Sequence, residues 1–435
     1  MAEKSNIRLT IKGFIVTVLM ILLLIPTFIM HTLVDERKAR QQDAFCEISD
    51  KWARAQTLAG PVLSFPYEDY YTEPNGSVRK IKKYIHILPG ELTIQGELLP
   101  EKRYRGIYET VVYKSDLEIT GSFSDLWSLF SSIQPENVLF DEACLSMGIT
   151  DLRGIENNVT VDFNDTTYPF NSGVESTDLF NSGINARIPF NDKDSLNDRY
   201  NFSINLKLRG SEYIYFTPVG KETTLRLTSS WKAPSFDGAF LPDSREIKST
   251  GFTANWKVFH LNRNYPQSWL NSAYSMEGSS FGVTLYLPVD NYTKTDRSLK
   301  YAILFIALTF IIFFFLELIN HNSINPLQYI LIGFALSIFY ILLLSISEQL
   351  YFNIAYLIAS IMTIGIITWY SGSILKEKKL AYLVGGSLVI IYGFIFVIIQ
   401  VQDYALLIGS LGIFIILTVI MYFSRKIDWK GVEEN

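Results

Sequence analysis

The sequence predicts an α+β membrane protein, in which an all-β-rich, sandwich-like extracytoplasmic domain is joined to an α-helical bundle of six transmembrane spans. One apolar run of helix length lies at residues 13–34, and five more follow residue 298. Between them, short runs alternate polar with apolar residues and end at Gly, Pro or Asn, as β-strands do. Because a helix of roughly 20 apolar residues crosses a bilayer core, the chain is predicted to alternate between membrane and water.

The composition excludes one class of partner. Of the 435 residues 49% are hydrophobic and 19% are charged, whereas soluble proteins carry about 25% charged residues. The shortfall lies in the apolar runs, because residues 35–297 contain 35 acidic and 28 basic residues. This mild acidity argues against nucleic-acid binding, which needs a basic surface.

The first apolar run, residues 13–34, is interpreted as an uncleaved signal anchor. It is longer than the 7–15 residues of a signal-peptide core, and no small-residue cleavage site follows it. Residues 36–58 continue with helical spacing of Phe45, Ile48 and Trp52, which predicts a helical stalk. Gly60-Pro61 is predicted to end that stalk.

Residues 35–298 are predicted to form one β-rich domain outside the membrane. Its last strand is predicted to run from Phe281 to Val289, and one short helix is expected from Ser124 to Ile133. Two cysteines, Cys46 and Cys144, fall in this domain. Whether they pair stays open, because sequence does not show that they meet.

The remaining spans are predicted to form a bundle over residues 299–423. We place them at 299–319, 327–347, 351–370, 380–399 and 404–423. Lys and Arg gather at the N-terminus (1–12), in the loop after the fourth span, and at the C-terminus (424–435). The positive-inside rule then makes both termini cytoplasmic and residues 35–298 periplasmic.

Three stretches of the sequence contain residue types that can carry chemistry. Gly278–Gly282 matches the G-x-S-x-G pattern around Ser280, but a strand is predicted after it, where a nucleophile elbow needs a helix. Acidic groups near Asp162 and Asp192 lack the spacing of a calcium loop and read as solvated turns. The basic group at 79–83 reads as a solvated hairpin end. No cofactor or metal is expected.

Ionisable residues of the predicted spans lie near their ends. Glu317, His321 and Glu348 are placed at interfaces rather than at mid-depth, where a transport pathway would need them. Arg297 and Lys300, next to the second span, are expected to reach the outer headgroups.

Several stretches together resemble the CreD family of bacterial inner-membrane proteins, over nearly the whole chain and in the same order. The carriers are Tyr104–Tyr108, Val111–Tyr113, Asp151–Gly154, Leu208–Gly210, Pro234–Pro242, Gly251–Trp256, Pro288–Tyr292, Lys300–Ala302, Pro326–Tyr329 and Tyr340–Glu348. The resemblance implies an N-terminal span, a periplasmic domain and a membrane bundle, with a role in envelope integrity, envelope stress and β-lactam response. It implies no catalytic residue.

The sequence thus predicts a non-enzymatic protein that binds or scaffolds at the periplasmic face. Its site residues are expected at the membrane interface and at the junction of domain and bundle: Pro288, Asp290, Tyr292, Arg297, Lys300, Tyr301, Glu317 and Glu348. Membrane lipid and an envelope protein or polymer are the expected partners, and the oligomeric state is not indicated. The alternatives are a small-molecule or ion transporter, a periplasmic hydrolase using Ser280, and a sensor signalling through the bundle.

Overall fold

The chain divides into two compact units in a computed structural model that describes most of its residues. Those described are 13–72, 78–124, 126–131, 137–191, 196, 199–285, 291–320, 324–375, 377–401 and 404–425. One unit, Asp43–Pro288, is called the β domain; the other, Met1–Gln42 with Val289–Asn435, is called the membrane unit.

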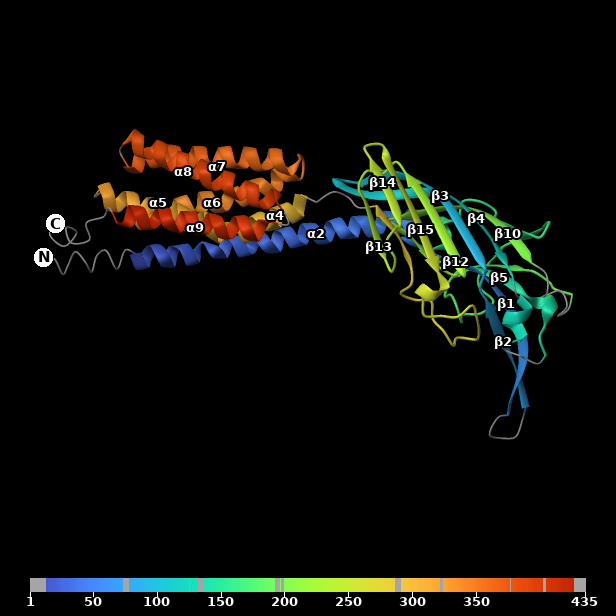
Figure 1. The fold of residues 1–435 in the computed structure, drawn as a ribbon. Helices are drawn as coiled ribbons and strands as arrows, with labels where there is room; N and C mark the ends of the chain where they lie inside the picture. Colours follow the sequence, from blue (N-terminus) through green and yellow to red (C-terminus); the bar gives the residue numbers. More distant parts are fainter. Residues whose placement is uncertain are drawn as a thin grey trace. The chain divides into compact units, whose positions relative to one another are not determined.

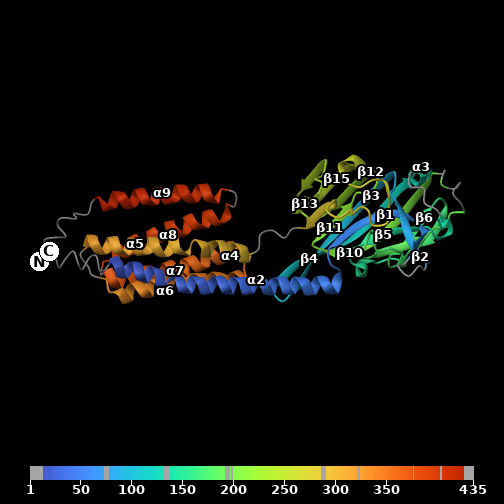
Figure 2. The same ribbon diagram turned by 90° about the horizontal axis from the view of Figure 1, so that it is seen from below.

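The β domain consists of two packed sheets (Figures 1 and 2). Among the described residues, nine strands form the first sheet, in the order β13-β17-β11-β1-β5-β9-β8, with β2 on β1 and β16 on β2. Its strands are β1 (Gln56–Thr72), β2 (Val78–Ile87), β5 (Cys144–Ile149), β8 (Asn171–Ser172), β9 (Gly183–Arg187), β11 (Tyr213–Thr217), β13 (Pro234–Gly238), β16 (Ser268–Leu270) and β17 (Phe281–Leu285).

The second sheet has eight strands within the described residues, in the order β14-β15-β12-β3-β4-β10-β6-β7. Its strands are β3 (Glu91–Arg105), β4 (Tyr108–Phe123), β6 (Thr160–Phe163), β7 (Thr166–Pro169), β10 (Tyr200–Ser211), β12 (Glu222–Ser229), β14 (Ser244–Lys248) and β15 (Gly251–Phe259). The sandwich-like β-rich domain predicted from alternation is therefore present.

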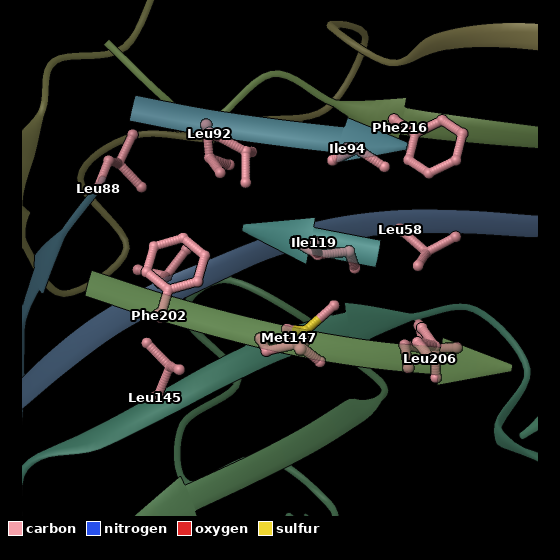
Figure 3. Close-up of a cluster of buried hydrophobic side chains, with 14 of the residues drawn as sticks. Leu58, Leu88, Leu92, Ile94, Ile119, Leu145, Met147, Phe202, Leu206 and Phe216 are labelled. Carbon is pink, nitrogen blue, oxygen red and sulfur yellow. The ribbon is translucent and has the colours of Figure 1, made fainter. Parts of the chain in front are cut away.

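The two sheets bury one face each against a shared core. Alternate residues of β10 are buried, as expected for a strand with one face inward. Leu206 and Phe202 of β10 lie opposite Met147 and Leu145 of β5 (Figure 3). Period-two alternation thus becomes apolar packing between the layers.

The sheets are connected through a change of layer at Glu212. β10 pairs antiparallel with β4, and the next strand, β11, pairs parallel with β1 in the other sheet. Glu212 between them has a φ of 67°, in the left-handed region, which redirects the chain in one residue. A second parallel pair, β12 with β3, joins distant parts of the sequence.

The stalk helix is shorter than the sequence predicts. The stalk belongs to α2 (Leu24–Trp52), which ends at Trp52 and not at Gly60-Pro61. The chain becomes extended because Gln56, with no exposed surface, makes buried side-chain hydrogen bonds that a further helical turn would break. Within the expected helix at 124–133, the described residues form α3 (Leu126–Ser131), and residues 125, 132 and 133 lie outside the described part of the chain.

The membrane unit contains helices that run alongside one another (Figures 1 and 2). Six helices of the described residues are long and apolar enough to cross a membrane. They are Gly13–Trp52, α5 (Ala302–Asn320), α6 (Pro326–Ser347), α7 (Phe352–Leu375), α8 (Lys378–Gln400) and α9 (Ala405–Ser424). A seventh, short helix, α4 (Asn291–Lys300), precedes α5.

Small residues allow close helix packing in this unit. A Cβ on Gly333 of α6 would lie 2.0 Å from Cδ1 of Leu23, so a larger residue there would displace the Leu23 side chain. Ala355 and Ala359 of α7 have no exposed surface. In the interior of this unit, three aromatic rings pack in tilted and edge-to-face arrangements: Phe305 of α5, Phe339 of α6 and Tyr392 of α8.

The two cysteines are not joined in a disulfide. Cys46 is exposed on α2 and Cys144 is buried in β5. Burial raises the pKa of Cys144 to about 11, so this thiol stays uncharged at neutral pH.

The two-sheet core predicts a clear contrast between two leucines. Leu206→Ala removes a fully buried side chain and should lower the free energy of unfolding by about 2–5 kcal/mol. Leu99→Ala, at a residue 51% exposed, should change it by less than about 0.5 kcal/mol. Thermal unfolding of the purified full-length protein measures both. Equal losses would contradict the packing described.

Candidate functional site

Asn291 at the start of α4 holds the turn between α6 and α7. Its Nδ2 donates to the carbonyl of Ser347 over 2.7 Å, and its Oδ1 accepts from the backbone N–H of Phe352 over 3.3 Å. One amide therefore joins the last residue of α6 to the first residue of α7.

Glu348, the C-cap of α6, is the acidic centre of this turn. Its Oε1 accepts from the hydroxyl of Tyr292 over 3.4 Å and lies 3.3 Å from Nε of Arg37 on α2. The carboxylate is mostly buried, with 15% of the side chain exposed. Helices α2, α4 and α6 thus meet at one carboxylate.

Asp296 of α4 is a second acidic centre. Its carboxylate oxygens lie 3.3 Å from Nδ1 of His31, 3.6 Å from Nζ of Lys38 and 3.3 Å from Nζ of Lys300. Burial alone would raise the pKa of Asp296, but these cations hold it below its ordinary value. It therefore stays ionised and ties α2 to α4.

A pocket of about 310 Å³ opens beside the α6–α7 turn. It is lined by Asn291, Ser347, Glu348, Gln349, Leu350 and Tyr351. Its lining combines one carboxylate with the C-terminal end of α6, where the helix dipole is negative.

The structure brings together only some of the residues predicted to form the junction. Tyr292 and Glu348 are in contact. Arg297 and Tyr301 are half-buried, and Lys300 is exposed beside Asp296. Pro288 and Asp290, with His321, lie outside the described residues.

Glu317 belongs to the opposite end of α5, about 25 Å along the helix from Lys300 at 1.5 Å per residue. It is buried, and it accepts from the hydroxyl of Tyr329 over 3.1 Å and from the backbone N–H of Ile324 over 3.2 Å. Asn325 caps α6 at the same place. These contacts shape the α5–α6 connection.

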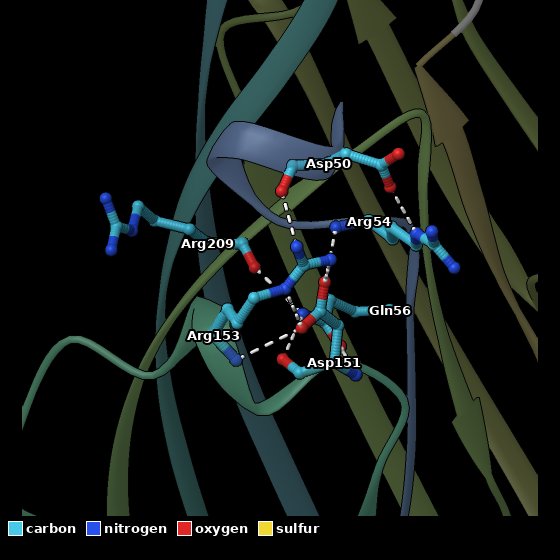
Figure 4. Close-up of polar contacts among 6 residues, drawn as sticks. All are labelled: Asp50, Arg54, Gln56, Asp151, Arg153 and Arg209. Atoms are coloured by element: carbon cyan, nitrogen blue, oxygen red, sulfur yellow. Dashed lines mark hydrogen bonds and ion pairs between the residues drawn. The ribbon is translucent and has the colours of Figure 1, made fainter. Parts of the chain in front are cut away.

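A third polar group, in the β domain, was not foreseen: the helix clasp, formed by Asp50, Arg54, Gln56, Asp151 and Arg153 (Figure 4). Asp151 accepts from the backbone N–H of Arg54 over 3.0 Å and pairs with Nη2 of Arg153 over 2.7 Å. Arg153 also donates to the backbone carbonyl of Asp50, which lies in the last turn of α2. Its guanidinium lowers the pKa of Asp151 to about 2.

Gln56 is the buried centre of the helix clasp. Its Nε2 donates to the carbonyls of Asp151 and Arg209 over 2.9 and 3.1 Å, and its Oε1 accepts from the backbone N–H of Asp151 over 3.1 Å. A Cβ on Gly154 would lie 2.7 Å from Nε2 of Gln56, and one on Gly210 would lie 2.2 Å from the hydroxyl of Tyr113. Both glycines are required by this close approach.

The two Leu-Arg-Gly tripeptides of the sequence, at 152–154 and 208–210, therefore face each other across Gln56. Ile155 and Leu208 form a β-bridge between them. The repeated tripeptide thus marks two chain segments that meet at Gln56.

Trp52, the last residue of α2, is enclosed by cations. The guanidinium carbons of Arg103 and Arg209 lie 4.8 and 4.9 Å from its ring centroid. Its Nε1 donates to the carbonyl of Tyr113 over 3.4 Å. Arg105 pairs with Glu47 one turn earlier, so the β3–β4 hairpin holds the end of α2.

Ser64, His86 and Asp178 form a group of the residue types that serine hydrolases use, but the serine and the histidine are buried. Nδ1 of His86 lies 2.9 Å from Oγ of Ser64, and Nε2 lies 3.5 Å from Oδ2 of Asp178. His86 is 1% exposed, and the cavity beside it, about 10 Å³, has room for one water. Burial lowers the pKa of His86 to about 4. No substrate reaches Ser64 in this arrangement.

The structure gives no catalytic or metal-binding role to the described residues of the three motifs singled out in the sequence. Ser280 lies directly before strand β17, so the helix that a nucleophile elbow requires does not follow it. Lys80, Lys82 and Lys83 pair with Glu68, Glu142 and Asp69. Within the described residues, which exclude Asp192, Asp194 and Asp198, no His, Cys, Asp and Glu side chains gather as metal ligands do.

Comparison with known proteins gave two consistent matches. A family model described as "Inner membrane protein CreD" matches residues 8–430. The chain is also 31% identical over 414 residues to "Inner membrane protein CreD" of Escherichia coli (strain K12). That match covers 94% of this chain and 91% of the other protein.

The helix clasp predicts a pH-dependent contribution from Asp151. Its folded pKa of about 2 lies below the ordinary 3.8, so its stabilisation is complete above about pH 4 and is lost as the pH falls toward 2. Asp151→Asn should cost on the order of 1 kcal/mol at pH 7 and progressively less below pH 4. Asp116→Asn, at an exposed pair with Lys207, is the control. Thermal unfolding of each variant between pH 7 and pH 2 measures these costs. A cost for Asp151→Asn that does not change with pH would show that the charge of Asp151 does not stabilise the fold.

Buried His86 predicts acid sensitivity at a higher pH. Its folded pKa of about 4 lies below the ordinary 6.5, so stability is complete above about pH 6.5 and falls as the pH drops toward 4. The loss should approach about 1.4 kcal/mol per pH unit. His86→Gln keeps a polar group near Ser64 without titrating. If melting temperatures of wild type and variant decline in parallel from pH 7 to 5, another group is responsible.

Proposed function

Because the chain belongs to the CreD family of inner membrane proteins, we propose that it supports cell-envelope integrity without catalysing a reaction. Its β domain binds or scaffolds an envelope protein or polymer, and it contributes to the responses to envelope stress and β-lactams. The helix α2 connects that binding domain to the membrane unit.

The proposal places the β domain in the periplasm and both chain ends in the cytoplasm. The support is the positive-inside rule, because Lys378 and Lys379, at the start of α8, fall on the same side as the basic N-terminus. The opposite loop, at α6–α7, carries Glu348 and no Lys or Arg.

The observation that carries a binding role is the set of apolar side chains exposed at strand ends of the β domain. On the β3–β4 hairpin, Leu99, Tyr104 and Ile107 are 51%, 64% and 46% exposed. On β14 and the chain before it, Ile247 and Leu241 are 50% and 68% exposed. Exposed apolar clusters mark interaction surfaces in soluble domains, whereas the cavity at His86 admits no substrate.

The packed interior of the membrane unit favours binding over transport. Tyr340 and Phe339 on α6 and Tyr392 on α8 are buried against one another. Glu317 and Glu348 lie at helix ends, and a transport pathway would place ionisable groups between them.

The test is complementation of a deletion strain. Wild-type protein should restore resistance to β-lactams and detergents. A Tyr104→Ser, Ile107→Ser double variant should fail to restore it, because it removes the exposed apolar tip of the β3–β4 hairpin without touching the core. Leu241→Ser tests the second surface, and Trp127→Ser, at an exposed residue of α3, is the control.

Membrane levels of each variant, measured by immunoblot, separate loss of function from loss of protein. A crosslinking amino acid at position 104 should then capture the same partner as one at 107. The proposal is wrong if the deletion strain has normal envelope sensitivity, or if the hairpin variant complements fully.

A further inference from the structure

We propose that the pocket at the α6–α7 turn binds a primary ammonium group, presented by the ethanolamine headgroup of a membrane phospholipid. This site lies within the membrane unit and does not depend on what the β domain binds. The charged groups of the pocket, its hydrogen-bonding groups and its place at the ends of two membrane helices favour this occupant.

The pocket contains a carboxylate and the negative end of a helix dipole, and the guanidinium of Arg37 lies beside that carboxylate. Glu348 supplies the carboxylate, and its Oε1 contacts both the hydroxyl of Tyr292 and Nε of Arg37. The C-terminal end of α6, a 22-residue helix, adds the negative end of its dipole. The favoured occupant therefore carries an ammonium, which meets the Glu348 carboxylate, together with an anionic group that meets Arg37.

The lining selects a cation that donates hydrogen bonds. The amide nitrogen of Asn291 is already used on the carbonyls of Ser347 and Leu350. The lining thus offers acceptors: the Glu348 carboxylate and backbone carbonyls of the turn. A primary ammonium has three donors to satisfy them, whereas the quaternary ammonium of choline has none.

A lipid source follows from the neighbouring residues. Leu350 and Tyr351 are 42% and 82% exposed, and Ile354 and Leu357 continue the exposed apolar surface along α7. Acyl chains would lie on that surface, with the headgroup at Tyr351, the kind of ring found where apolar and polar layers meet. Arg37, 3.3 Å from Oε1 of Glu348, is placed to attract the lipid phosphate.

Native mass spectrometry of the full-length protein tests the proposal. Released from detergent with phosphatidylethanolamine or phosphatidylcholine of matched acyl chains, wild type should retain the ethanolamine lipid preferentially. Glu348→Gln keeps an oxygen for Tyr292 but removes the charge, and should lower ethanolamine-lipid occupancy about tenfold. Glu377→Gln, an exposed acid before α8, should leave it unchanged.

Tyr351→Leu is a second variant for the same measurement. It should not disturb folding, because this side chain is 82% exposed. It should lower occupancy by about threefold through the lost cation–π contact. Equal retention of the two lipids, or unchanged occupancy in both variants, overturns the proposal. Binding of soluble phosphoethanolamine with no preference between the lipids would assign the pocket to a free amine and overturn the lipid source.

Discussion

The buried side chain of Gln56 determines how the β domain begins. Its amide nitrogen donates to the backbone carbonyls of Asp151 and Arg209, and its amide oxygen accepts from the backbone N–H of Asp151. A buried amide without such partners would cost several kcal/mol, so the chain must leave the helix before Gln56. This side chain therefore sets the end of α2, the start of β1 and the meeting of two segments far apart in sequence.

Charged contacts around this centre are unequal in strength. Asp151 is 9% exposed and accepts hydrogen bonds from the backbone as well as from a guanidinium, so its ionised form is strongly stabilised. The pair of Lys207 with Asp116 is 58% exposed on both sides, and such pairs are worth little in water. The same contrast separates Asp296, enclosed by cations of α2 and α4, from the exposed pairs of the hairpins.

Local pattern predicted the elements, while their meeting points depended on tertiary contacts. The spans follow from length and hydropathy, and the strands of β3 and β10 from alternation, because both signals lie within one element. The end of α2 did not follow, since the breaker Gly60-Pro61 lies beyond Gln56, whose partners are about 95 and 153 residues away. For the same reason Ser64, His86 and Asp178 could not be assembled from sequence. Tyr292 and Glu348 were singled out separately, but their contact was not foreseen.

The helix α2 makes charged contacts within both units. In the membrane unit, His31 and Lys38 meet Asp296, and Arg37 meets Glu348. In the β domain, Arg153 binds the carbonyl of Asp50, and two arginines enclose Trp52. Hydrogen-bonded turns connect these contacts from Leu24 to Trp52 without a break. One continuous helix therefore carries contacts of both the membrane unit and the β domain.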